Sequence, residues 1–500
     1  MKPYNILILL LMFFFAGCGK ELNVPSRHQV PENNMWQQRN DARSAVFATY
    51  GLMRAALANE NAFFAYGELR AGNFRATSRA DIGAVTTQQL NANFATLEEW
   101  KDWRRFYAVI AQANLCLQKL PQVLEKDFRY NEQKMKVDIA SVRFLRALAY
   151  FYIVRIWGDA PLITDAVEGG FTSRPRDPQT KILDFVEQEL IAASVNLPWN
   201  YDGSQPEQIG VYYDQAGSFW LSCIASKAAC YAMLAHVYAW RGDYASCESN
   251  ARLVYENTSL GKYTFTSAST LTAETAGVFS ALGNGVIFSL TADARYQESS
   301  AKGHIEDWTL SAPLVDKPVP DVYVPADSVL QIFNEANDQR FAISVAGAVS
   351  GGYFQNFSNP VPMFSKIKAR TYTQEPLFNN FQSAIVITRY EDIVLLRAEA
   401  LYYLNDINNA MVYLNAVRTR RGLAEFKLQT GGNLLDAILK ERQRELLGEG
   451  QRWFDLVRNR KAHLYSGLSI AQIGQGAALW PLSKNTLLNN GSLQQNSYWK

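Results

Sequence analysis

Residues 389–421, RYEDIVLLRAEALYYLNDINNAMVYLNAVRTRR, predict two helices joined by a short turn. Small and apolar residues stand where the two helices would touch, and Asn405-Asp406 forms the break between them. Gly422 follows as a C-terminal cap. The pair spans about 34 residues, the size of a tetratricopeptide unit. The stretch therefore predicts a mainly α fold built from helical pairs.

Similar helical patterns occur near 101–157 and 223–257, and the C-terminal pattern continues to about residue 447. The patterns do not repeat at a fixed period, because segments 158–222 and 258–386 separate them. Both segments are rich in Gly, Ser, Thr, Pro and aromatic residues, and they show only short strand-like runs. Irregular segments this long are usually functional or disordered, and the aromatic content argues against disorder. We predict a single domain over 39–500, a helical scaffold with two long insertions.

The N-terminus has the features of a lipoprotein signal. Residues 1–17 contain an apolar run of 11 residues, too short to span a hydrocarbon core of about 30 Å as a helix. The run leads into Ala16-Gly17-Cys18, which resembles a bacterial lipobox and predicts lipidation of Cys18. The alternative is an ordinary cleavage site beside a coincidental cysteine. Residues 18–38 are polar with no helical period, which predicts a flexible tether.

Composition narrows the functional classes. The chain has 500 residues and a net charge of +2, which argues against dedicated nucleic-acid binding. Aromatic residues make up 13% of the chain, so we expect some of them at the surface. No HExxH, GxSxG or Walker motif is present in the sequence.

Five residues could be read as chemical or covalent sites. Glu441 and Glu445 lie one helical turn apart and could act as paired carboxylates, but their arginine neighbours favour a structural ion-pair network. Cys230 and Cys247 fall on adjacent predicted helices, where they could form a disulfide or serve as small buried residues. His236 lies in an apolar helix and is expected to be a hydrogen-bonded core residue.

Several motifs in order are similar to the SusD/RagB family of outer-membrane nutrient-binding lipoproteins. The resemblance covers nearly the whole chain from Cys18. The residues that carry it are Arg143–Asp159 with Pro161-Leu162-Ile163, Lys227-Ala228-Ala229, Arg389–Leu401, Leu414–Arg418 with Arg421-Gly422-Leu423, Glu441–Leu446, Glu449–Arg458 and Leu479–Leu482.

The resemblance implies a SusD-like fold and a binding role without catalysis. Such lipoproteins sit over a SusC-like TonB-dependent transporter in the outer membrane, and they capture oligosaccharides or, in some branches, peptides. It also implies that lipid on Cys18 anchors the chain in the outer membrane, facing the cell exterior. A structural Ca²⁺ is possible in the family, but no Asp-rich loop locates one, and we expect no other cofactor.

Ligand residues are expected in the loop after the first helix and in the central insertion. A sugar offers an apolar face and a rim of hydroxyls, so its sites combine aromatic and polar side chains. The candidates are Tyr66, Asn73, Phe74, Arg75, Tyr296, Trp308 and Tyr353. For each aromatic in the insertions, simple packing is the competing interpretation. Many family members have an aspartate where this chain has Asn73.

Two other functions stay open at this point. One is a scaffold lipoprotein that contacts only proteins, and the other is an extracellular glycoside hydrolase.

Overall fold

The computed structural model describes residues 35–500 apart from 167–171, 276, 281–283, 293–299, 301 and 373–378. Its long helices are α2 Arg39–Ala58, α6 Arg104–Lys126, α7 Glu132–Trp157, α8 Gln179–Asn196, α9 Lys227–Arg241, α10 Tyr244–Glu256, α15 Tyr390–Tyr403, α16 Ile407–Arg420 and α18 Leu434–Leu446. The shorter helices are α3 Ala62–Gly67, α4 Ala80–Thr86, α5 Ala95–Lys101, α11 Thr258–Gly261, α12 Ala268–Leu271, α13 Ile305–Thr309, α14 Ala326–Ile332, α17 Leu428–Gly431, α19 Arg452–Arg458, α20 Ile470–Gly474 and α21 Lys484–Asn489.

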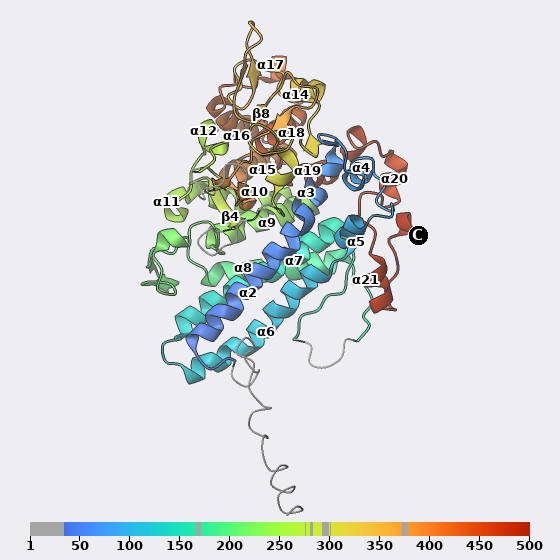
Figure 1. Ribbon diagram of the computed structural model, residues 1–500. Coiled ribbons are helices and arrows are strands. Elements are labelled where there is room, and N and C mark those ends of the chain that lie inside the picture. Colours follow the sequence, from blue (N-terminus) through green and yellow to red (C-terminus); the bar gives the residue numbers. More distant parts are fainter. Residues whose placement is uncertain are drawn as a thin grey trace, which may run out of the picture.

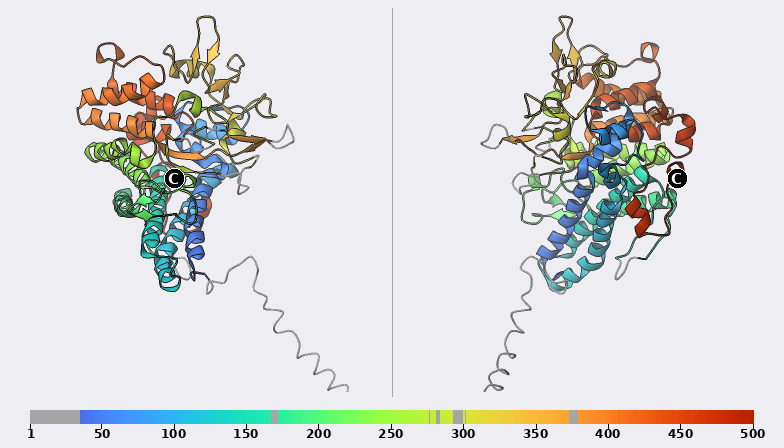
Figure 2. Two further views of the ribbon diagram at one scale, coloured as in Figure 1. Left: turned by 90° about the vertical axis from the view of Figure 1, so that its left-hand side faces the viewer. Right: turned by 45° about the vertical axis from the view of Figure 1, so that its right-hand side comes forward.

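The long helices stack in chain order. α7 packs between α6 and α8, α9 between α8 and α10, and α15 between α10 and α16. α2 covers α6, and α18 covers α15 (Figures 1 and 2). Because α10 and α15 are neighbours in space, the residues between them form an insertion that leaves the array and returns to it. The predicted helical pairs and the long central insertion are therefore confirmed.

Local sequence explains where the paired helices begin and end. Ser226 caps the N-terminus of α9, and Gly242 ends it in a left-handed conformation with φ 78°. Asp243 then caps α10, and Asp406 caps α16 in the same way. Aspartate and serine side chains accept hydrogen bonds from backbone amides that have no partner within the helix. Both predicted turns are thus confirmed at the residues that make them.

The strands are short, and each pairs with one antiparallel partner. They are β1 Arg75–Ala76 with β5 Val322–Tyr323, β2 Ser204–Gln205 with β3 Gln208–Ile209, β4 Val286–Leu290 with β12 Ile385–Arg389, β6 Ala342–Ile343 with β7 Val349–Ser350, β8 Phe354–Gln355 with β9 Met363–Phe364, and β10 Arg370–Tyr372 with β11 Asn379–Phe381. The buried β4–β12 ladder joins the start of the central insertion to its end, directly before α15.

The interpretation of residues 158–222 as an irregular insertion is wrong in its middle. α8 occupies 179–196 and buries Ile182, Val186, Leu190 and Ala193 against its neighbours. These positions recur every three or four residues, so the helical signal was present. The Gly-, Ser- and Pro-rich residues on either side obscured it.

The packed body begins before the predicted tether of residues 18–38 ends, because Trp36 is already buried.

Cys230 and Cys247 are both buried and free, so they serve as small core residues and not as a disulfide. His236 is buried and hydrogen-bonds through Nε2 to Asp392, at 2.8 Å, which confirms its core role.

A buried carboxylate fixes the second half of the 158–222 segment to α7. The hydroxyls of Tyr130, Tyr212 and Tyr213 all donate to Asp138, which is fully buried. Burial raises the pKa of Asp138 to about 6, although the three hydroxyl donors act to lower it. The aromatic residues of this segment are therefore largely core residues.

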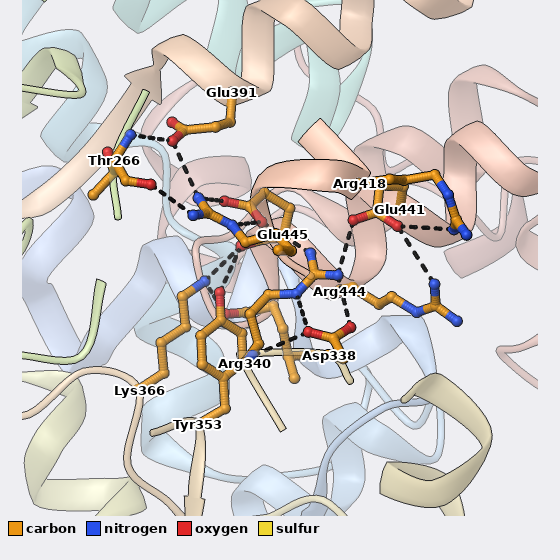
Figure 3. A network of polar contacts seen from close by, with 12 residues as sticks. Thr266, Asp338, Arg340, Tyr353, Lys366, Glu391, Arg418, Glu441, Arg444 and Glu445 are labelled. Carbon is orange, nitrogen blue, oxygen red and sulfur yellow. Dashed lines mark hydrogen bonds and ion pairs between the residues drawn. The ribbon is translucent and has the colours of Figure 1, made fainter. Parts of the chain in front are cut away.

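Glu441 and Glu445 belong to a buried network of ion pairs (Figure 3). Glu445 contacts Arg421 at 2.6 Å, Arg389 at 2.8 Å and Arg340 at 2.9 Å. Burial alone would raise the pKa of Glu445, but the three guanidinium groups hold it well below its usual range. The predicted structural network is confirmed, and it joins α18 to α15, to the end of α16 and to the central insertion.

We expect Glu445→Gln to lower the free energy of unfolding by about 3–5 kcal/mol, because it removes the buried carboxylate that three guanidinium groups share. The matched control is Glu132→Gln, which removes an exposed pair with Lys136 and should change the stability far less, because solvent screens that pair. Urea denaturation of both variants measures the difference. Equal losses would show that the network does not hold the insertion to the helices.

Candidate ligand-binding site

Most of the predicted ligand aromatics lie in the core. Tyr66, Phe74, Trp308 and Tyr353 are each at most 2% exposed. Phe64 contacts Phe74 and Trp308 through ring edges, with centroid separations of 4.8 and 6.4 Å. The expectation that these rings form an exposed stacking surface is therefore wrong. The physical reason is that the loop after α3 and the helix α13 fold back onto one aromatic cluster.

The other predicted residues are placed as follows. The hydroxyl of Tyr353 donates to the carbonyl of Glu445, so this tyrosine belongs to the ion-pair network. Asn73 is buried, and its Oδ1 accepts from Gln443 Nε2 at 2.7 Å. Arg75 is exposed on β1. Tyr296 and Cys18 lie outside the described residues.

A small pocket lies where the end of α2, the start of α13 and the β4–β12 ladder meet. It has a volume of about 20 Å³, room for one or two water molecules. Its lining combines apolar and polar side chains, namely Arg54, Ala58, Asn61, Phe63, Leu290, Ala292, His304, Ile305, Ser383 and Ile385. A pocket of this size accepts one hydroxyl or hydroxymethyl group but not a whole sugar ring.

Asn61 supplies an unused hydrogen-bond acceptor in this pocket. Its side chain is 1% exposed, and its Nδ2 donates to the carbonyl of His304 at 3.3 Å. Its Oδ1 has no hydrogen-bond partner among the described residues. Leaving a buried acceptor unpaired costs about 1–3 kcal/mol, so the position favours a molecule that donates a hydrogen bond.

The backbone beneath the pocket is strained. Glu60 and Asn61 both adopt left-handed conformations, with φ 49° and 50°. Such residues are uncommon outside glycine and cluster at functional sites. Trp100 Nε1 donates to the carbonyl of Glu60 at 3.1 Å and holds the turn in place. Because of this turn, the Asn61 side-chain amide points toward the segment 303–305 and not toward solvent.

Further polar groups surround the same position. Arg54 Nη1 donates to the carbonyl of Thr291 at 2.7 Å, close to the end of β4. Ser383 donates its hydroxyl to Glu306 Oε2 at 2.6 Å, and Glu306 Oε1 has no hydrogen-bond partner among the described residues. Of these groups, the pocket itself is lined by Asn61, Arg54 and Ser383, so it offers the Asn61 oxygen to a hydroxyl donor beside the apolar walls of Phe63 and Leu290. Ala292, at its edge, directly precedes the stretch that contains Tyr296.

Two wider grooves lie elsewhere. One, of about 490 Å³, runs along α16 and residues 425–429, and the other, of about 500 Å³, lies between Trp240, Tyr403 and Arg460. None of the predicted ligand residues lines these grooves or the small pocket. Among the described residues, however, only the small pocket of the three is lined by a buried asparagine whose side-chain oxygen has no hydrogen-bond partner. We therefore assign the candidate site to the small pocket. Sequence reasoning missed it, although an asparagine at a helix end is a known signal for a left-handed residue.

The described residues carry no group of three or more His, Cys, Asp or Glu side chains that could hold a metal ion. Across the same residues, no helix has both the length and the apolar character needed to cross a membrane.

Known proteins resemble this chain over almost its full length. Residues 350–499 match a family model described as "SusD family", and residues 49–212 match one described as "Starch-binding associating with outer membrane". SusD-like protein P38 of Formosa agariphila is 26% identical, with 98% of each chain covered.

Solved structures agree. A SusD superfamily protein from Bacteroides thetaiotaomicron is 40% identical, has a TM-score of 0.84, and the match covers 93% of this chain and 100% of the other. A laminarin-binding SusD-like protein shares the fold with a TM-score of 0.69 at 24% identity, over 92% of this chain and 99% of its own. By these matches, the chain belongs to the SusD family.

Proposed function

We propose that this protein captures an oligosaccharide at the cell surface and passes it to a SusC-like TonB-dependent transporter. The observation that carries the binding part is the buried, unpartnered Oδ1 of Asn61 in a pocket with apolar and polar walls. Family membership supports a glycan ligand, because relatives include a protein named for laminarin binding.

Capture follows from the chemistry of the pocket. One hydroxyl or hydroxymethyl group of the glycan enters the pocket and donates a hydrogen bond to Asn61 Oδ1. The rest of the sugar stays outside, because the volume of about 20 Å³ admits no ring. Binding of this kind uses hydrogen bonds and apolar contact and needs no cofactor.

The proposed function includes no catalysis. Glu441 and Glu445, the paired carboxylates that a hydrolase reading would use, are fully buried among arginine side chains. A glycosidase acid needs a raised pKa, whereas that of Glu445 is lowered. The binding role is therefore favoured over the hydrolase.

Position in the cell follows from the N-terminus. Lipidation of Cys18 would anchor the protein in the outer membrane, with residues 18–34 leading to the folded body. Facing the exterior, the protein would meet glycans before the transporter does. The family model that matches residues 49–212 is named for outer-membrane association, which supports this placement.

We expect Cys18→Ala to release the protein from the outer-membrane fraction of the producing cells, while the unchanged protein stays bound. Cell fractionation with metabolic labelling by a radioactive fatty acid measures both location and lipid attachment. Cys223→Ala is the matched control, since this cysteine lies in the folded body. Continued labelling of the Cys18→Ala protein would refute the anchor.

We expect Asn61→Gly to weaken glycan binding at least tenfold, equivalent to about 1.4 kcal/mol, because it removes the amide but tolerates the left-handed backbone. An affinity screen of polysaccharides, oligosaccharides and peptides identifies the ligand, and calorimetry then compares the variants. Asn405→Gly is the matched control, because Asn405 is exposed and also left-handed, with φ 63°. Unchanged affinity in Asn61→Gly would show that the ligand does not bind at this pocket. Binding of peptides but of no glycan would show that the ligand is a peptide.

Glu306, which accepts the Ser383 hydroxyl at the pocket, predicts a pH dependence of stability. Burial raises the pKa of Glu306 to about 7, from an ordinary value of 4.5. The folded protein therefore retains a proton that the unfolded chain loses, and stability falls as the pH rises from about 4.5 to 7. The loss is on the order of 3 kcal/mol.

We expect Glu306→Gln to remove this pH dependence, because the amide does not ionise. The free energy of unfolding of the variant should therefore rise relative to that of the wild type from pH 5 to pH 8. Denaturant titrations at both pH values measure it. Other buried carboxyl groups contribute equally to the variant and the wild type, so their effects cancel in the difference. One of them is Glu68, whose pKa is raised by burial to about 8. A difference that stays constant with pH would mean that Glu306 is ionised in the folded protein.

A further inference from the structure

The turn between α6 and α7 exposes an aromatic side chain. Phe128 is 92% exposed, whereas most aromatic residues of the chain pack in the core. Two further apolar side chains are exposed near the β2–β3 hairpin, with Ile209 67% and Val211 60% exposed. A single exposed apolar residue needs no explanation, but a group of three at one end of a molecule does.

Hydrogen bonds place these residues at one end, together with the start of α2. Gln133 Nε2 donates to the carbonyl of Pro206 at 2.8 Å, which holds the hairpin against the first turn of α7. Asp127 Oδ2 accepts from the backbone amide of Arg39 at 2.9 Å, which holds the turn against the first residue of α2. Figure 1 shows this end at the lower left of the folded body, where α2 begins and α6 ends. We call it the basal tip.

The basal tip also carries basic side chains. Lys126 Nζ donates to the carbonyl of Trp36, and Lys134 Nζ donates to the carbonyl of Arg129. Among the described contacts, neither ammonium group has a carboxylate partner. Arg129 and Lys136 lie beside them, each more than half exposed and paired with one acid. Exposed apolar groups flanked by cations are the pattern of a surface that rests on lipid headgroups.

We infer that the basal tip contacts the surface of the membrane, with Phe128, Ile209 and Val211 at the level of the headgroups and Lys126 and Lys134 facing lipid phosphates. The occupant is lipid because of where the chain enters the folded body. Cys18 and Met35 are 17 residues apart, a span of at most about 60 Å, and the chain joins the body at this tip. The inference rests on the proposed lipidation of Cys18.

The opposite end of the molecule provides the comparison. The β6–β7 hairpin exposes Val345 completely, and residues 341–365 contain no charged side chain. Figures 1 and 2 show this hairpin at the top, away from the basal tip. An apolar residue without nearby cations and without the anchor beside it should not reach lipid. Val345 is therefore a matched control for Phe128.

The test uses the full lipidated chain in vesicles of phosphatidylcholine and phosphatidylglycerol. Phe128→Cys and Val345→Cys, each combined with Cys223→Ser, carry an environment-sensitive fluorophore, and the vesicles carry a quencher attached to lipid. We expect at least threefold more quenching at position 128 than at 345. Lys126→Glu with Lys134→Glu should lower the quenching at 128 by half or more.

Each contrary result has its own meaning. Equal quenching at the two positions, in protein that floats with the vesicles, would overturn the contact of the basal tip and leave the anchor intact. Protein that does not float would overturn the anchor and this inference together. Neither result would affect glycan binding at Asn61, which is measured on the soluble protein.

Discussion

The carboxylate of Glu445 is the contact on which the arrangement of the two halves of the molecule depends. It lies at the end of α18 and is bonded to arginines from the end of β12, from the end of α16 and from the central insertion. Lys366 and Tyr353, also from the insertion, bond to its backbone carbonyl. A buried ion network adds little net stability compared with a well-packed apolar core, but it penalises any arrangement that separates its members. It therefore sets one register between the insertion and the helices.

That register decides where the candidate site lies. The β4–β12 ladder ends at Arg389, which is itself a partner of Glu445. The ladder forms one wall of the small pocket, through Leu290 and Ile385, and the end of α2 forms another. Rigid walls matter for a site with room for only one functional group, because a small shift of either wall would close it. The left-handed turn at Asn61 adds the polar group that such a site needs for specificity.

Much of the scaffold could be predicted from the sequence because its signals are local. Helices α9, α10 and α16 begin at serine or aspartate caps, and Gly242 and Asn405-Asp406 mark the turns within the two pairs. The ion pairs of Glu445 could be predicted only as a type, since Arg340 is distant in sequence. The aromatic residues led to a wrong prediction of the ligand site. A tryptophan such as Trp308 looks the same in the sequence whether its loop projects into solvent or folds back onto the core. Whether a polar side chain such as Asn61 is buried without a hydrogen-bond partner, or exposed like Arg75, depends on the three-dimensional packing. The sequence alone therefore could not identify Asn61.

Hydrogen–deuterium exchange with and without the bound oligosaccharide shows where on the molecule the ligand binds. We expect slower exchange on binding in residues 60–64, 302–306 and 383–386, which surround the small pocket, with little change along α16. Protection confined to α16 and residues 425–429, or to the groove between Trp240 and Tyr403, would contradict the assignment of the site.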